Sequence, residues 1–61
     1  MTREQKQVDL AEQSEMFSLW ELAAQHWQTA IDVAEQANRI HVYRACIEHC
    51  EYNANQAKQA K

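Results

Sequence analysis

The chain has 61 residues without Gly or Pro, and its nine acidic side chains outnumber six Lys and Arg to give a formal net charge of −3. Its length limits it to one small domain, residues 1–61, which buries too little surface to be comfortably stable alone, so we expect a homo-oligomer or a partner chain. Abundant Ala, Glu and Gln favour an all-α fold, and the acidic balance argues against direct binding of DNA.

The chain shows no pattern of a secretory leader or a membrane span. Its first residues, MTREQKQ, are polar and lead into no apolar region, and no run approaches about 18 apolar residues. Cys46 and Cys50 lie one helical turn apart, where a mutual disulfide fits poorly. We therefore expect a soluble, cytoplasmic protein with reduced thiols and no contact with a membrane.

The first predicted helix covers residues 3–15. Thr2 and Gln5 form a Thr-x-x-Gln pattern that can cap its start. Its few apolar positions include Val8, Leu10 and Ala11. Because so thin a stripe offers little surface to a core, we expect this helix to be held weakly.

The second predicted helix covers residues 19–36. Ser18 and Glu21 match a Ser-x-x-Glu capping box, and Phe17 and Leu22 stand where a hydrophobic staple would form. These patterns place the start of the helix directly after Ser18. The connection to the first helix is then short, which predicts that the two helices pack as antiparallel neighbours.

The second helix carries the strongest apolar pattern of the chain. Its apolar side chains recur at steps of three and four, and they are Trp20, Ala23, Trp27, Ala30, Ile31 and Ala34. The alanines between the two tryptophans would let another helix come close. Trp and Tyr also dominate binding hot spots, so the same stripe can serve as core, as partner surface or as both.

No Gly or Pro marks the end of this helix. Continuing the stripe by heptads would reach His41, Arg44 and Glu48, whereas the apolar residues fall at other positions, a slip of about 100° around a helix. A turn near residues 37–39, with Asn38 as a cap, would explain the slip. The alternative is one continuous helix with a weaker stripe through Leu19, Leu22, Val33 and Ile40.

The third predicted helix covers residues 39–57. Its apolar positions have the spacing of a short heptad seam, and they are Ile40, Tyr43, Ile47, Cys50, Ala54 and Ala57. Such a seam requires a partner helix. The tail has no large apolar residue, so we expect disorder from about residue 56, including the tail at residues 58–61.

The sequence gives little sign of chemistry. Cys46, His49 and Cys50 crowd one helical turn and are the candidate ligands of a metal ion, with His26 or His41 as a fourth. Closed zinc sites usually draw ligands from two separate elements, and buried free Cys behaves as a small hydrophobe, so we expect no metal and no cofactor. Without a Gly-rich loop or room for a substrate pocket, we expect no enzyme and no catalytic residues.

The middle of the chain resembles two kinds of helical protein. Trp20, Ala23, Trp27 and Ala30 look like the second helix of a tetratricopeptide unit, and a lone unit of that kind should pair with another chain. Residues 11–50 are more similar to the ANR family, short bacterial negative regulators of AraC-type activators. The similar positions are Trp20, Ala23, Ala24, Trp27, Ala30, Ala34, Asn38, Tyr43, Arg44 and Cys50. Ser18 stands where a Gly is common in that family.

The resemblance implies a protein that binds an AraC/XylS-type activator directly, hinders its dimerisation or DNA binding, and so damps a virulence regulon. It also implies contact with an H-NS-type nucleoid protein. The candidate partner-binding or core residues are Trp20, Ala23, Trp27, Ala30, Ile40, Tyr43, Arg44, Ile47 and Cys50. The alternatives are a DNA-binding activator similar to PerC, which would use Arg39 and Arg44, and a purely structural helical oligomerisation module.

Overall fold

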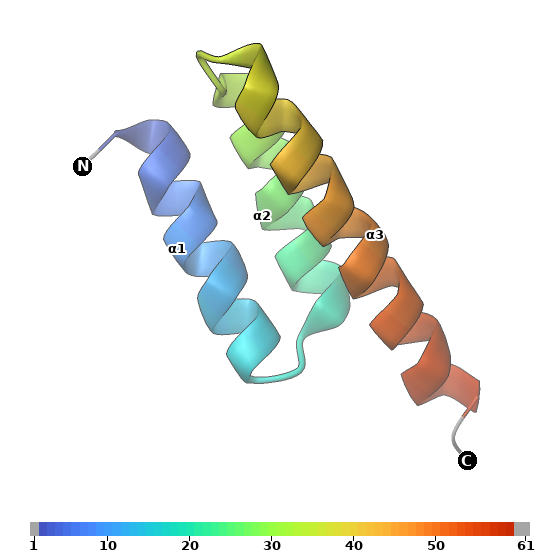
Figure 1. The fold of residues 1–61 in the computed structure, drawn as a ribbon. Helices are drawn as coiled ribbons and strands as arrows, with labels where there is room; N and C mark the ends of the chain where they lie inside the picture. Colours follow the sequence, from blue (N-terminus) through green and yellow to red (C-terminus); the bar gives the residue numbers. More distant parts are fainter. Residues whose placement is uncertain (1, 60–61) are drawn as a thin grey trace.

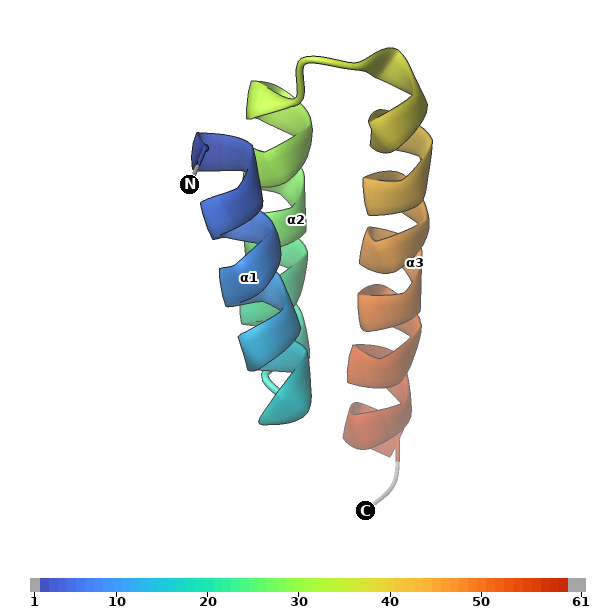
Figure 2. The ribbon, with the colours of Figure 1, turned by 60° about the vertical axis from the view of Figure 1, so that its left-hand side comes forward.

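Three helices make up the computed structural model, which describes residues 2–59. They are α1 (Arg3–Met16), α2 (Trp20–Val33) and α3 (Ala37–Gln59). Short turns join them, so that successive helices run antiparallel, and α2 packs along both α1 and α3 (Figure 1 and Figure 2). No strand occurs within residues 2–59, which confirms the predicted all-helical class.

The start of α1 forms the Thr2 half of the predicted capping pattern, while the Gln5 side chain donates to Asp9 at 3.0 Å. The Thr2 side chain accepts a hydrogen bond of 3.1 Å from the backbone N–H of Gln5. This bond satisfies one of the backbone donors that a helix start leaves without a partner inside the helix.

The turn between α1 and α2 differs from the prediction. Ser18 has a left-handed φ of 59°, and its N–H donates to the Glu15 carbonyl at 2.9 Å, while the N–H of Leu19 donates to the Ser14 carbonyl at 2.8 Å. This pair of bonds is a Schellman motif that closes α1, so Ser18 ends one helix and does not cap the next. The predicted capping box is therefore wrong, and the N-cap of α2 is Leu19, whose side chain makes no capping bond.

The predicted staple residues lie beside the same turn. Phe17 and Leu22 are 74% and 43% exposed. A staple would bury both side chains against each other, so these exposures contradict the predicted role. The cause is the Schellman turn, which holds Phe17 at the corner between the helices, one residue before the left-handed Ser18.

The break between α2 and α3 is present, so the alternative of one continuous helix is wrong. It lies at residues 34–36, three residues earlier than predicted, and Asn38 belongs to the first turn of α3. Ala34 leaves the helix with an extended backbone, at φ −67° and ψ 131°. Among the described residues only Ser18 has a positive φ without being Gly, so this turn needs neither Gly nor Asn, and no residue type marks its position in the sequence.

The end of α3 also corrects the prediction. The helix continues to Gln59, so the predicted end at residue 57 and the disorder expected from residue 56 are wrong for residues 56–59, whereas residues 60–61 lie outside the described part. Lys58 in the last turn pairs with Glu21 of α2 at 3.2 Å. A cation near a helix C-terminus is also favoured by the helix dipole, so this residue supports the final turn in two ways.

The core lies where α2 meets its two neighbours. The buried hydrophobic residues are Ala11, Ala23, Trp27, Ala30, Tyr43 and Cys50. The rings of Trp27 and Tyr43 stack with centroids 5.6 Å apart and planes at 27°. Trp20, Ile31, Ala34 and Ile47, which the two predicted stripes contain, are half-buried and pack against this core. The two stripes thus face each other across the α2–α3 contact, as the period of the sequence predicts.

None of the helices within residues 2–59 combines the length and the apolar character that crossing a membrane requires.

Candidate partner-binding site

A buried carboxylate ties the first turn of α1 to α3. Glu4, only 5% exposed, accepts a hydrogen bond from Nη1 of Arg39 at 3.0 Å and another from the hydroxyl of Tyr43. The bond from Tyr43, followed by that from Arg39, lowers the pKa of Glu4 below its ordinary value, while burial first and then the bond to Glu4 raises the pKa of Tyr43. Arg39 and Tyr43 therefore hold the fold together, and Tyr43 is not free to contact a partner.

A second carboxylate, in the last turn of α1, links all three helices. Glu15 of α1 accepts a hydrogen bond of 2.6 Å from the indole N–H of Trp27 and one of 3.5 Å from the thiol of Cys50. Burial, followed by the nearby Glu15 charge, raises the pKa of Cys50 to about 12, and burial also raises the pKa of Cys46. Since the thiolate is the reactive form of cysteine, neither side chain is set up as a nucleophile at neutral pH.

The candidate metal ligands do not form a site. His49 is exposed, its ring stands edge-on to Trp20 with centroids 6.0 Å apart, and its Nε2 contacts the amide of Asn53 at 3.0 Å. Cys50 points into the core beside Glu15. Within residues 2–59 no group of three or more His, Cys, Asp or Glu side chains lies close enough to hold a metal ion.

An apolar groove lies at the end of the molecule where α3 extends past the α1–α2 turn. The last turns of α3 extend past the α1–α2 turn, so they lack a helix on one side (Figure 1). The groove has a volume of about 650 Å³ and is lined by Ser18, Leu19, Trp20, Glu21, Leu22, Gln25, Ala54, Ala57 and Lys58. The small side chains of Ala54 and Ala57 leave it open, and the Glu21–Lys58 ion pair spans it from α2 to α3.

Large apolar side chains are exposed at the α1–α2 turn, and two of them, Leu19 and Leu22, line the groove. Met16, Phe17, Leu19 and Leu22 are 76%, 74%, 50% and 43% exposed, and all four lie in or next to the α1–α2 turn. We call these four residues together with the groove the apolar end. Several large apolar side chains exposed at one end of a small protein mark an interaction surface. The apolar end is therefore the candidate partner-binding site.

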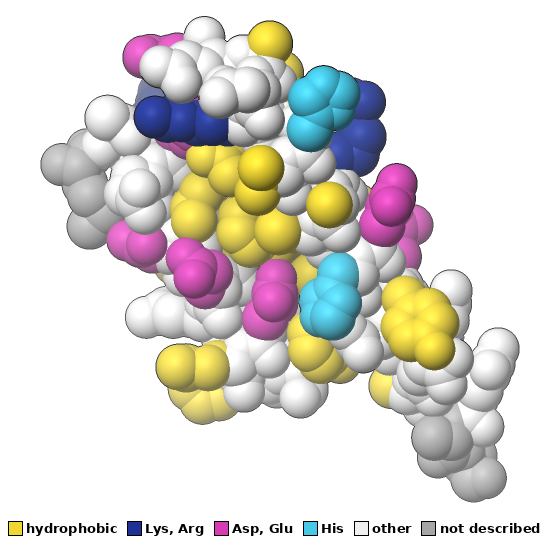
Figure 3. Space-filling model, in the orientation of Figure 1, with side chains coloured by type: hydrophobic (Ala, Val, Ile, Leu, Met, Phe, Trp, Pro, Cys, Tyr) yellow, Lys and Arg dark blue, Asp and Glu magenta, His cyan; other side chains and the backbone are white. Residues whose placement is uncertain are grey.

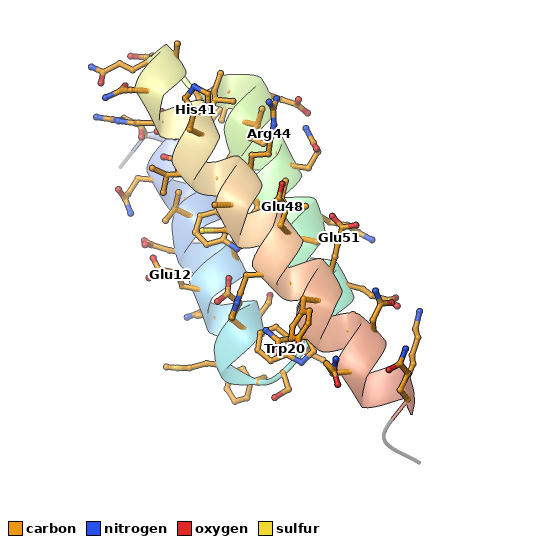
Figure 4. The ribbon with its side chains drawn as sticks, turned by 45° about the vertical axis from the view of Figure 1, so that its right-hand side comes forward. Glu12, Trp20, His41, Arg44, Glu48 and Glu51 are labelled. Atoms are coloured by element: carbon orange, nitrogen blue, oxygen red, sulfur yellow. The ribbon has the colours of Figure 1, made fainter. Side chains whose placement is uncertain are left out.

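The exposed face of α3 has a different character. Figure 4 shows His41, Arg44, Glu48 and Glu51 along this helix, with Trp20 near the apolar end. In the view of Figure 3 the acidic side chains spread across the middle of the molecule, while Lys and Arg lie toward the end where α2 turns into α3. The described part of the chain therefore presents no continuous basic face in this view.

Most of the partner-binding candidates from the sequence lie inside the fold. Ala23, Trp27, Ala30, Tyr43 and Cys50 are buried, while Ile40 and Ile47 are half-buried. Of the remaining two, Trp20 lines the groove and Arg44 is exposed on α3. The seam of α3 thus meets α2 of the same chain over most of its length, and only its last members, Ala54 and Ala57, reach the apolar end.

Sequence reasoning missed Leu19 and Leu22 as surface residues. Their signal was present, because both are large apolar residues that fall off the Trp20–Trp27 stripe and so have no place in the core. An apolar residue on the outer side of an otherwise amphipathic helix is a better indicator of a contact surface than one on the stripe.

The fold and the groove define a small three-helix domain with an open apolar end. The chain matches no family model, no curated protein and no solved structure.

Proposed function

We propose that the chain is a transcription modulator that binds an AraC/XylS-type activator by protein contact and inhibits its dimerisation or DNA binding, which damps a virulence regulon. The observation that carries the contact is the open groove flanked by exposed Leu19 and Leu22. The resemblance of residues 11–50 to the ANR family supplies the partner. The same resemblance adds contact with an H-NS-type nucleoid protein.

The mode of contact is an amphipathic helix of the activator laid into the groove. Such a helix presents apolar side chains at successive turns, and the Ala54 and Ala57 side of the groove leaves room for them. The net charge of −3 favours a basic partner over an acidic one. Proteins that bind DNA carry basic patches, so an activator of this type offers the complementary charge.

The side-chain contacts give less support to direct binding of DNA. Arg39 is engaged with the buried Glu4, and Arg44 shares its face of α3 with Glu48 and Glu51 (Figure 4). A protein that binds phosphates gathers Lys and Arg on one surface, because each neutralised phosphate adds to affinity. Two arginines placed in this way form no such surface.

The test is a pull-down of an AraC-type activator with the tagged chain, with nuclease added to remove bridging DNA. The informative variant is Leu22→Asp, because Leu22 lines the groove and is already 43% exposed, so the charge should leave the fold intact. Losing a buried Leu contact is worth roughly 1.5–3 kcal/mol, which predicts about a 10- to 100-fold weaker complex. Circular dichroism checks that the variant stays helical.

The matched control is Val42→Asp, which places the same charge on a side chain 59% exposed in the first half of α3. We expect this variant to retain the activator. Equal retention by Leu22→Asp and Val42→Asp would refute the groove as the contact site. A promoter fragment shifted by the chain alone, in a salt-sensitive manner, would instead support the DNA-binding alternative.

A further inference from the structure

We infer that two copies of the chain pair through their apolar ends about a twofold axis, with Met16 and Phe17 of each copy seated in the groove of the other. A twofold interface uses the same patch on both copies, so that patch must contain both a projecting and a receiving part. The apolar end contains both, within a few residues of each other.

The projecting part is the corner of the α1–α2 turn. Met16 and Phe17 are 76% and 74% exposed, the highest values among the exposed large hydrophobic side chains. The Schellman bonds of Ser18 and Leu19 to the last turn of α1 fix the backbone directly after Phe17. The side chains therefore project from a defined corner and not from a loose loop.

The receiving part is the groove between Leu22 of α2 and the alanines of α3. Its volume of about 650 Å³ is sufficient for two apolar side chains. Ala54 and Ala57 continue the seam that meets α2 through Tyr43, Ile47 and Cys50. Because α2 begins at Trp20, only its first residues flank the last part of this seam, and the groove lies between them.

The chain leaves more large apolar side chains exposed than it buries, so a second chain can bury surface that the fold does not. Three of the six buried hydrophobic residues are Ala, whereas six large hydrophobic side chains are exposed, four of them at the apolar end. A stable interface of standard size takes roughly 800 Å² from each partner. That is about a sixth of the 4568 Å² that the chain exposes.

Charge favours this end as the meeting point of two like chains. Each copy carries a net charge of −3, so two copies repel each other overall. The charged side chains that line the groove are Glu21 and Lys58, and they neutralise each other at 3.2 Å. Because salt screens the remaining repulsion, we expect added salt to hold or strengthen the pairing, whereas it would weaken a contact made by opposite charges.

The experiment is sedimentation equilibrium of the purified chain over a wide concentration range. We expect the mass to rise from 7.2 kDa to twice that value, and Phe17→Asp to shift the transition to at least about 10-fold higher concentration. Val42→Asp, the matched control, should leave it unchanged. A single 7.2 kDa species at every concentration, or equal effects of both variants, would overturn the proposal.

Mixed crosslinking tests the geometry separately from the affinity. Phe17→Cys chains are mixed with Ala57→Cys chains, and a mild added oxidant takes two electrons and two protons from the pair of thiols to form one disulfide. We expect a bond between residues 17 and 57 of different copies, identified by peptide mapping against the native cysteines. A yield no higher than that of Val42→Cys mixed with Ala57→Cys would overturn the arrangement.

The dimer and the proposed activator complex use the same groove, so they exclude each other. The two experiments above involve the chain alone and do not rest on the proposed function. A chain that stays monomeric yet retains the activator overturns the dimer only. A chain that dimerises yet retains no activator leaves the dimer standing and removes the proposed function.

Discussion

Replacing Ser18 by Gly is expected to stabilise the protein. Ser18 is the residue at which α1 ends in a left-handed conformation, with φ at 59°. An L-residue with a Cβ pays a steric cost there that Gly does not, because its Cβ crowds the neighbouring carbonyl oxygen. The two Schellman bonds use backbone atoms only, so the substitution keeps both of them.

The size of the effect follows from two opposing terms. Removing the Cβ relieves roughly 1–2 kcal/mol, and the greater freedom of Gly in the unfolded chain takes back about 0.5–1 kcal/mol. The net gain is about 0.5–1 kcal/mol. In a domain of this size each 1 kcal/mol moves the melting temperature by roughly 4–8 °C, so we expect a rise of about 2–8 °C.

The assay is thermal melting followed by circular dichroism, at the lowest chain concentration that gives a signal, so that self-association contributes little. The control is Gln13→Gly at an exposed position inside α1, which should lower stability by about 0.5–1 kcal/mol. If Ser18 capped α2, Ser18→Gly would cost a few tenths of a kcal/mol. A lower melting temperature for Ser18→Gly would therefore refute the Schellman assignment.

Two further predictions concern buried titrating groups. The folded-state pKa of Glu4 is lowered, so the stabilising effect of this carboxylate is present above its ordinary pKa and is lost as pH falls. Glu4→Gln should therefore lower the melting temperature at neutral pH and reduce the fall of the melting temperature on the acid side. An unchanged dependence of the melting temperature on pH would contradict this. The pKa of Cys50 is raised from 9.0 to about 12, so the protein should lose stability as pH rises above 9.0. The thiol should also resist iodoacetamide at neutral pH until the chain unfolds. Mass spectrometry that finds Cys50 alkylated faster than the core amides exchange would count against its burial beside Glu15.

The sequence predicts the buried face of α2 well, because the burial of this helix follows the helical period. α2 lies between two helices, so its buried positions follow the helical period, and Ala23, Trp27 and Ala30 occupy the predicted stripe. The apolar stripe of α3 is shifted around the helix relative to that of α2, and this shift correctly predicted a break between the two helices. Its position could not be found, because a turn with only negative φ values accepts any ordinary residue.

The carboxylates that link the helices are the part that local patterns could not predict. Glu4 and Glu15 look like surface residues of a polar helix. Their hydrogen-bond partners lie 35 and 39 residues away for Glu4, and 12 and 35 residues away for Glu15. Such pairings appear only once the helices are assembled. They also explain how α1 is attached although its apolar stripe is thin, because α1 is held to α2 and α3 by hydrogen bonds as well as by Val8 and Ala11.

The apolar end follows from this way of building a core. Alanines let three helices approach closely around one Trp–Tyr pair, and the carboxylates of α1 complete the contact, so little large apolar surface is consumed inside. Four of the six exposed large apolar residues then lie in or next to the turn that Ser18 closes. If α3 were as short as α2, Ala54, Ala57 and Lys58 would be absent and the groove would not form. The part of α3 beyond Cys50 therefore gives this three-helix domain its surface for a second chain.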